Sequence, residues 1–218
     1  LQSAAAAVAG WRARGLDGAR GAINVSVHQL LDTRFVDRLA EVLGRHGLPP
    51  GAIELELTET AFQTSASTVE SLRRIRDSGV ELALDDFGTG YSSLTSLSRL
   101  PLRRVKLDRS LIAEAPASPR AESIARAIIG VGHSLGLEVT VEGVERREQL
   151  EWLAGCGAVY VQGFLIARPM PAAEVPGFAA RSRQLLQQLR SAGGGAAGGQ
   201  PADDSGVPFR PGPGHARR

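Results

Sequence analysis

Short apolar runs alternate with amphipathic stretches along most of the chain. Six runs rich in β-branched or other apolar residues predict strands at 22–27, 53–59, 80–87, 104–108, 137–144 and 159–167. The stretches between them have helical spacing. In 32–44, for example, Phe35, Leu39 and Val42 share one face, and Gly47 and Pro49 follow as stop signals. The same pattern predicts helices over 67–78, 121–135 and 145–153.

Strands that alternate with helices predict an α/β fold with a parallel sheet covered by helices. The six strand–helix units are spaced by roughly 22–33 residues. Two architectures fit this order: an open doubly wound sheet, or part of a (β/α)₈ barrel. Because a complete barrel has eight strands, the barrel requires about two strands to be missing before the first predicted one. Residues 1–14 would then end a helix that follows a lost strand.

The carboxyl-terminal part of the chain has a different character. Residues 171–190 predict a last amphipathic helix. From residue 191 the sequence is rich in Gly, Ala and Pro and has few large apolar residues, which is typical of disorder. We therefore expect a folded domain over 1–190 and a disordered tail over 191–218.

Composition excludes several classes of protein and singles out two residues. A net charge of +2 gives no electrostatic case for binding a nucleic-acid polymer, and one cysteine excludes an intramolecular disulfide. No apolar stretch approaches the ~20 residues of a membrane-spanning helix. Of 25 basic residues only Lys106 is a lysine, and Asn24 is the single asparagine. Both lie in predicted strands beside acidic residues. Their presence in a chain that otherwise uses Arg indicates positions that need a compact ammonium or a neutral amide oxygen, which Arg and Asp do not provide. Chance is the alternative for either residue alone.

Acids, amides and one lysine gather where the predicted strands end. They are Asn24, Glu56, Glu59, Asp85, Asp86, Lys106, Asp108, Glu142, Glu145 and Gln162. In both candidate folds ligands bind at the carboxyl ends of the strands, and buried charges there need a partner or a metal. Oxygen donors without a nearby histidine favour Mg²⁺ or Mn²⁺ over Zn²⁺. Glu54 lies nearer the amino end and predicts a structural ion pair. A purely structural salt-bridge network is the alternative for the whole set.

The ordered motifs resemble those of the EAL domain family, bacterial phosphodiesterases that hydrolyse cyclic di-GMP. The matching segments are 24–26, 56–59, 85–94, 106–108, 142–145 and 162–164, and the resemblance runs from Leu1 to about Pro171. Within them, the Asp-Asp-Phe-Gly loop that begins at Asp85 is the most specific. The family has a modified (β/α)₈ barrel, so the resemblance implies an incomplete TIM-like barrel of about six βα units.

The resemblance also implies a role for each residue. Catalytic residues would be Lys106, Glu142, Glu59 and Gln162; metal ligands Asn24, Glu56, Asp85 and Asp86; and substrate contacts Asp108, Glu145 and Gly88. Lys106 would orient the attacking water, Glu142 would be a metal-side carboxylate or a base, and Glu59 would anchor the loop after Asp86. The expected reaction is hydrolysis of cyclic di-GMP to linear pGpG with two Mg²⁺ or Mn²⁺ ions.

One part of the family pattern is absent. No Glu-x-Leu-x-Arg precedes Asn24, although that Glu is a metal ligand in the family and that Arg contacts the substrate phosphate. We therefore expect this segment alone to be unstable and nearly inactive, and its parent chain to be an active enzyme. The alternatives are an inactive EAL-type domain that binds cyclic di-GMP or a protein partner, and a different metal-dependent barrel with Lys106 as base. The Asp-Asp-Phe-Gly loop disfavours the last.

The resemblance extends to the protein's surroundings. It implies an upstream sensor or GGDEF-type domain in the parent chain and a homodimer as one assembly to test. It also implies a cytoplasmic location, with a membrane tether of the parent left open.

Overall fold

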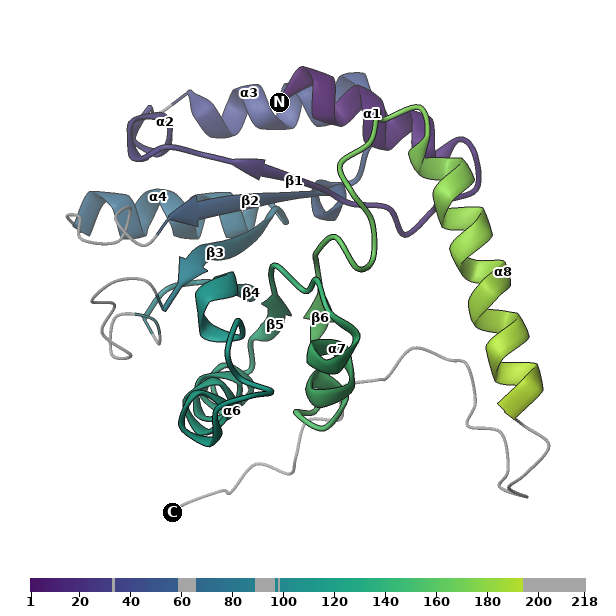
Figure 1. The fold of residues 1–218 in the computed structure, drawn as a ribbon. Helices are drawn as coiled ribbons and strands as arrows, with labels where there is room; N and C mark the ends of the chain where they lie inside the picture. Colours follow the sequence, from purple (N-terminus) through teal and green to yellow (C-terminus); the bar gives the residue numbers. More distant parts are fainter. Residues whose placement is uncertain (33, 59–65, 89–96, 98, 194–218) are drawn as a thin grey trace, which may run out of the picture. The chain divides into compact units, whose positions relative to one another are not determined.

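Six parallel strands form one sheet in the first part of the chain, as a computed structural model shows (Figure 1). The strands are β1 (Gly21–Asn24), β2 (Ile53–Thr58), β3 (Glu81–Phe87), β4 (Arg104–Leu107), β5 (Glu138–Val141) and β6 (Tyr160–Val161). Their spatial order is the same as their order along the chain. A doubly wound sheet reverses its strand order at a switch point, so the doubly wound alternative is wrong. The sheet is the curled wall of an incomplete barrel, as the second alternative predicted.

The structure describes residues 1–32, 34–58, 66–88, 97 and 99–193. The chain divides into two compact units, Leu1–Pro176 and Gly177–Arg218. The sheet and the site residues discussed below belong to the first unit.

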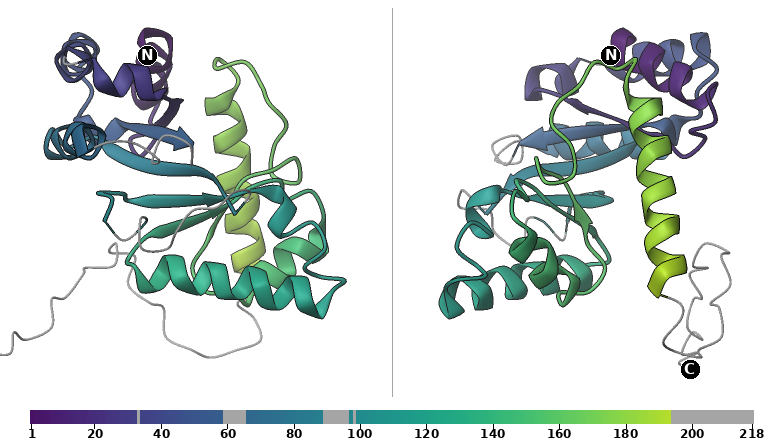
Figure 2. Two further views of the ribbon diagram at one scale, coloured as in Figure 1. Left: turned by 90° about the vertical axis from the view of Figure 1, so that its left-hand side faces the viewer. Right: turned by 45° about the vertical axis from the view of Figure 1, so that its right-hand side comes forward.

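Helices cover the outer side of the curled sheet (Figure 2). They are α1 (Gln2–Arg12), α2 (Val27–Leu31), α3 (Phe35–Arg45), α4 (Ala66–Asp77), α6 (Pro119–Ser134) and α7 (Arg147–Ala154), with short 3-10 turns η1 (Pro50–Ala52) and η3 (Arg109–Leu111). Helix α1 packs on β1, α4 on β3 and α6 on β5. Each predicted helix in this unit is therefore present, with ends that differ by a few residues.

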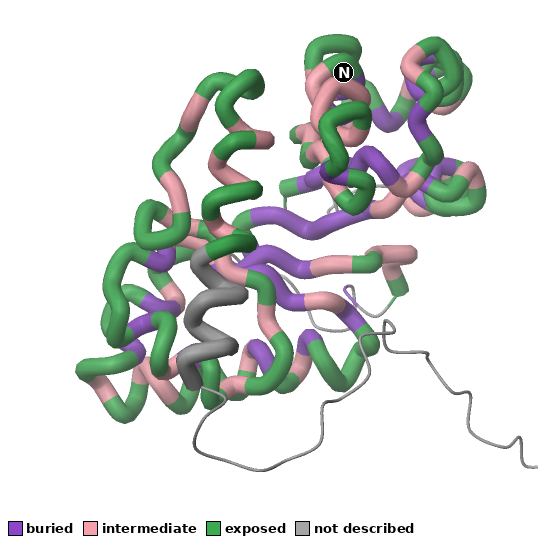
Figure 3. The backbone as a smooth tube through the Cα atoms, turned by 90° about the vertical axis from the view of Figure 1, so that its right-hand side faces the viewer, coloured by how far each residue is buried: buried purple, intermediate pink, exposed green. Residues whose placement is uncertain are grey.

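The strand side chains alternate between an apolar outer face and a polar inner face. The central strands bury Leu55, Leu57, Leu82, Leu84, Val105, Leu107, Val139 and Val141, each at most 1% exposed. Figure 3 shows these strands as the buried centre of the unit. Burying each such side chain stabilises the fold by roughly 1.5–3 kcal/mol. On β2 and β4 the intervening residues are polar: Glu54, Glu56, Arg104 and Lys106 form ion pairs with one another on the inner face.

Two elements differ from the predictions. Strand β6 has two residues rather than the nine of 159–167, because the chain turns at Gly163, whose carbonyl accepts hydrogen bonds from Ile166 N and Ala167 N. The predicted strand 22–27 ends at Asn24 and α2 follows. Ser26 caps this helix by accepting a hydrogen bond from Gln29 N, and Ser26 N in turn donates to Gln29 Oε1, so local capping ends the strand early.

Helix α8 (Val175–Gly193) confirms the helix predicted over 171–190, although it begins four residues later. In the described part of the chain, no helix combines the length and the apolar character that crossing a membrane requires. The tail from residue 194 lies outside the described residues. The division into 1–190 and 191–218 and the disorder of the tail therefore stay predictions.

Candidate active site

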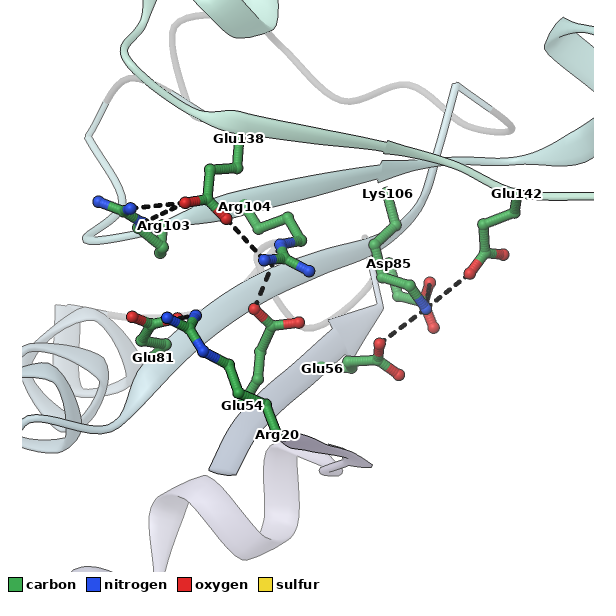
Figure 4. A network of polar contacts seen from close by, with 10 residues as sticks. All are labelled: Arg20, Glu54, Glu56, Glu81, Asp85, Arg103, Arg104, Lys106, Glu138 and Glu142. Carbon is green, nitrogen blue, oxygen red and sulfur yellow. Dashed lines mark hydrogen bonds and ion pairs between the residues drawn. The ribbon is translucent and has the colours of Figure 1, made fainter. Parts of the chain in front are cut away.

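Lys106 lies between three carboxylates on the inner face of the sheet (Figure 4). Its Nζ is 2.8 Å from Glu56 Oε1, 2.9 Å from Asp85 Oδ1 and 2.7 Å from Glu142 Oε1. The lysine is 6% exposed. Burial by itself lowers the pKa of Lys106, but hydrogen bonds to the three carboxylates outweigh it and raise the pKa above its usual range. The side chain is therefore an ammonium at neutral pH.

A bulge in β3 directs two adjacent acids towards this lysine. Between the paired positions Leu84–Val105 and Phe87–Leu107, β3 has two residues where β4 has only Lys106. Asp86 has a φ of 55°, a left-handed conformation that Asp tolerates better than most residues. Successive residues of a regular strand point to opposite faces, so this turn is what brings Asp86 close to its neighbour Asp85.

Asp85, Asp86 and Glu142 form one oxygen cluster. A carboxylate oxygen of each lies within 4.8 Å of one from both others. Burial raises the pKa of Asp86, and Asp85 and Asp108 raise it further, against the lowering effect of Lys106. Burial likewise raises the pKa of Glu142, supported by Asp85 and Glu56 and opposed by Lys106. One ammonium is thus shared among more acids than it can neutralise.

The charge of the cluster fits a divalent cation. The carboxylates of Glu56, Asp85 and Glu142 contact a single ammonium, and that of Asp86 lies beside Asp85 and Glu142. Four acids against one ammonium leave an excess of three negative charges in a half-buried site. Such an excess is costly unless cations balance it. The donors are carboxylate oxygens, which hard ions such as Mg²⁺ and Mn²⁺ prefer.

A second layer of ion pairs lies next to the cluster, towards the amino ends of the strands (left in Figure 4). Arg104 Nη2 is 2.6 Å from Glu138 Oε2, and Arg104 Nε is 3.4 Å from Glu54 Oε2. Arg103 Nη2 also contacts Glu138, at 2.5 Å. Burial raises the pKa of Glu54, with Arg104 lowering it. The predicted ion pair of Glu54 is confirmed, and this layer is balanced in charge.

Other predicted site residues lie at the rim. Asn24 ends β1 in register with Glu56 but is exposed. The side chain of Asp108 caps η3, its Oδ1 accepting a hydrogen bond from Ser110 N at 2.9 Å. Glu145 is exposed and its backbone N donates to Gln149 Oε1. None of these contacts tests the predicted roles.

Three further predictions concern loop residues. Gln162 is exposed directly after β6, and its backbone bonds to Val141 and Val144. Gly88 follows β3 with a φ of 101°. Glu59 lies outside the described residues, as do residues 89–96 of the loop after Gly88. The structure thus brings together Glu56, Asp85, Asp86, Lys106 and Glu142 and leaves the rest at the rim or undescribed.

Comparisons with known proteins agree with the motif resemblance. Residues 1–169 match the family model described as the EAL domain. Cyclic di-GMP phosphodiesterase NbdA of Pseudomonas aeruginosa is 44% identical over 160 residues, which are 73% of the chain and 20% of NbdA. The EAL domain of Mycobacterium smegmatis DcpA has a TM-score of 0.78 at 36% identity, over 83% of this chain and 82% of that one. The manganese and cyclic di-GMP complex of Klebsiella pneumoniae BlrP1 has a TM-score of 0.68 at 34% identity, over 75% and 42%.

The extent of these matches decides what they show. The chain spans 19–29% of the length of the leading curated relatives, so their whole-protein activities concern longer proteins. The family match, by contrast, covers all six strands and every residue of the acidic cluster. This chain belongs to the EAL domain family.

Proposed function

We propose that this domain hydrolyses one phosphodiester bond of cyclic di-GMP, giving linear pGpG, with Mg²⁺ or Mn²⁺ held by the acidic cluster. The observation that carries the proposal is Lys106 surrounded by carboxylates on the inner face of an EAL domain. Two proteins it resembles support the substrate: NbdA is named a cyclic di-GMP phosphodiesterase, and BlrP1 is described in complex with manganese and cyclic di-GMP.

The charge balance favours two divalent ions. One ion would leave the cluster with one negative charge, whereas two would leave one positive charge, which suits an anionic phosphodiester. We assign Asn24, Glu56 and Asp85 to the first ion and Asp86, with Asp85 shared, to the second. When bound, such ions supply an activated water and neutralise charge on the phosphate.

The protein's own groups would orient the water and accept its proton. Lys106 is a fixed ammonium, and its positive charge would orient the attacking water and stabilise charge that develops on the phosphate. Glu142 is the proposed proton acceptor, and its raised pKa moves it towards the range of an effective base near neutral pH. Gln162 and Glu59 complete the proposed catalytic set, and Asp108, Glu145 and Gly88 the substrate contacts.

Product analysis tests the proposal. The protein expressed from its complete reading frame is incubated with cyclic di-GMP and Mn²⁺, and the nucleotides are separated by chromatography. We expect pGpG to appear, EDTA to abolish it, and cyclic di-AMP to stay intact. Absence of product from a folded, manganese-loaded protein would overturn hydrolysis, and tight binding of intact cyclic di-GMP in that sample would favour the inactive EAL-type domain.

The setting of the domain is proposed on the same basis. We infer a cytoplasmic protein with an upstream sensor or GGDEF-type domain, and a homodimer as its assembly. Light scattering of the protein from the complete reading frame measures that assembly, and a monomer at micromolar concentration would contradict it.

A further inference from the structure

Two loops at the carboxyl end of the sheet approach each other too closely for a side chain to fit between them. A Cβ placed on Gly143 would lie 2.3 Å from Arg109 Cβ and 3.4 Å from Arg109 Cα. Gly143 has a φ of 65°, which L side chains rarely adopt. Gly143 directly follows Glu142, and Arg109 is the first residue of η3. The residue after the proposed proton acceptor is therefore pressed against the turn that follows β4.

Hydrogen bonds fix the backbone on both sides of Gly143. Glu142 N donates to Leu107 O at 3.0 Å, which ties the chain to β4. Val144 N donates to Gln162 O, also at 3.0 Å, which ties it to the end of β6. A left-handed residue between these two bonds turns the chain from one neighbouring strand to the other. A shift of Gly143 away from Arg109 must therefore move Glu142 or break one of the bonds.

The other side of the contact is also held in place. Asp108 caps η3 through the bond from Ser110 N to its Oδ1, and Asp108 N donates to Phe87 O at 3.3 Å. Arg109 follows this cap directly, so its Cβ position is set by backbone and cap rather than by a flexible side chain. The neighbour of Gly143 cannot move aside as the far end of a long side chain would.

We propose that Gly143 and Arg109 form a steric lock that positions Glu142 relative to Lys106 and Asp85. Gly143 and Arg109 are positioning residues, acting through the 2.7 Å contact between Glu142 Oε1 and Lys106 Nζ. The effect of the lock on metal binding and turnover rests on the proposed function, whereas the steric relationship does not. Glu142 is also one of the three acids of the oxygen cluster, and altering a partner that orients a group of a metal site typically changes metal affinity or activity by about 10–100-fold.

The primary test compares alanine variants of two glycines with similar positive φ angles, 65° at Gly143 and 72° at Gly136. Gly143→Ala adds a Cβ against Arg109, and Gly136→Ala adds one at a φ of 72° with no atom within 4 Å. Both are made in the protein from the complete reading frame. Mn²⁺ affinity is measured by calorimetry and metal-free stability by thermal unfolding in EDTA. We expect Gly143→Ala to lose about tenfold or more in Mn²⁺ affinity and in kcat, with Gly136→Ala losing only stability.

A second-site variant separates steric from electrostatic effects. Arg109→Gly removes the Cβ that an alanine at position 143 would meet, whereas Arg109→Ala removes the guanidinium and keeps that Cβ. In the Gly143→Ala background, Arg109→Gly is expected to recover most of the Mn²⁺ affinity and Arg109→Ala is not. Should Gly143→Ala alone fail to fold, folding itself is compared in the two double variants. We then expect Arg109→Gly to restore folding and Arg109→Ala not to restore it.

Two outcomes would overturn the lock. One is a Gly143→Ala protein whose Mn²⁺ affinity and kcat equal those of Gly136→Ala. The other is equal recovery by Arg109→Gly and Arg109→Ala. If the variants give either result while the wild-type protein forms pGpG, the lock is rejected and the proposed function stands. A wild-type protein that forms no pGpG rejects the proposed function, while the thermal and Mn²⁺ comparisons still decide the lock.

Discussion

Arg104 and Lys106 project from the same face of β4, and each lies between an acid of β2 and an acid at β5. Arg104 contacts Glu54 and Glu138, whereas Lys106 contacts Glu56 and Glu142. The spacing of two residues along β2 and β4 places the two sets in successive layers of the inner face. The Arg104 layer is balanced, since Arg103 also contacts Glu138. The Lys106 layer also holds Asp85 and Asp86, and its unbalanced charge marks it as the cation site.

Replacing Arg104 should lower the free energy of unfolding without weakening Mn²⁺ binding. Arg104→Met leaves the buried Glu54 without its cation, and breaking such a buried pair costs about 3 kcal/mol. Urea unfolding in EDTA measures the loss, and calorimetry measures Mn²⁺ affinity on the same sample. We expect a lower unfolding free energy and an Mn²⁺ affinity within about twofold of wild type. A stable variant that no longer binds Mn²⁺ would show that Arg104 belongs to the metal site.

Replacing Lys106 should reduce turnover, while Mn²⁺ and the nucleotide still bind. Lys106→Met removes the ammonium but no carboxylate, so the oxygen donors for the metal remain. We expect turnover of cyclic di-GMP to fall by about 100-fold or more, because a donor that stabilises transition-state charge is lost, while the nucleotide still binds. Mn²⁺ should also stabilise the variant by more than it stabilises wild type, since it balances charge that Lys106 no longer offsets. Turnover equal to that of wild type would remove Lys106 from the mechanism.

The order of apolar runs and amphipathic stretches was enough to predict a parallel sheet covered by helices, with acids at the carboxyl ends of its strands. The reason is physical: Leu55 and Leu57 must face the helices, so Glu56 between them must face the barrel interior. The parallel order then brings the strand ends to one edge. The resemblance to the EAL family added the roles, which the pattern alone left open between a metal site and a salt-bridge network.

Other features depend on contacts that periodicity does not encode. A regular strand would point Asp85 and Asp86 to opposite faces, and only the bulge and the left-handed Asp86 bring them together. In an arginine-rich chain, Arg104 has no sequence signal that separates it from a surface residue, yet it is an inner-face partner of Glu54. The contact of Gly143 with Arg109 joins residues 34 positions apart, although the Glu142-Gly143 pair at a strand end is a signal that a tight turn follows.

The two glutamates of β2 provide a matched test of the metal assignment. Glu54 and Glu56 share a strand and a face and are 4% and 7% exposed, but only Glu56 contacts Lys106. We expect Glu56→Ala to weaken Mn²⁺ binding and turnover together by about 10–100-fold, and Glu54→Ala to reduce stability only. Calorimetry with Mn²⁺ and thermal unfolding in EDTA distinguish the two effects. A normal Mn²⁺ titration of a folded Glu56→Ala protein would reject Glu56 as a ligand.

The pH dependence of stability should report on Glu54. Burial raises the pKa of Glu54 above its ordinary value of 4.5 in the folded state, so the folded protein holds this proton at a pH where the unfolded chain has lost it. The stability contributed by protonated Glu54 is therefore fully present below pH 4.5 and is lost as pH rises through the raised pKa. We expect the unfolding free energy of wild type, relative to Glu54→Gln, to fall over this interval. Urea unfolding of both proteins in EDTA from pH 4 to pH 7 measures the difference. A difference that grows with pH would mean that Arg104 stabilises the carboxylate more than burial destabilises it.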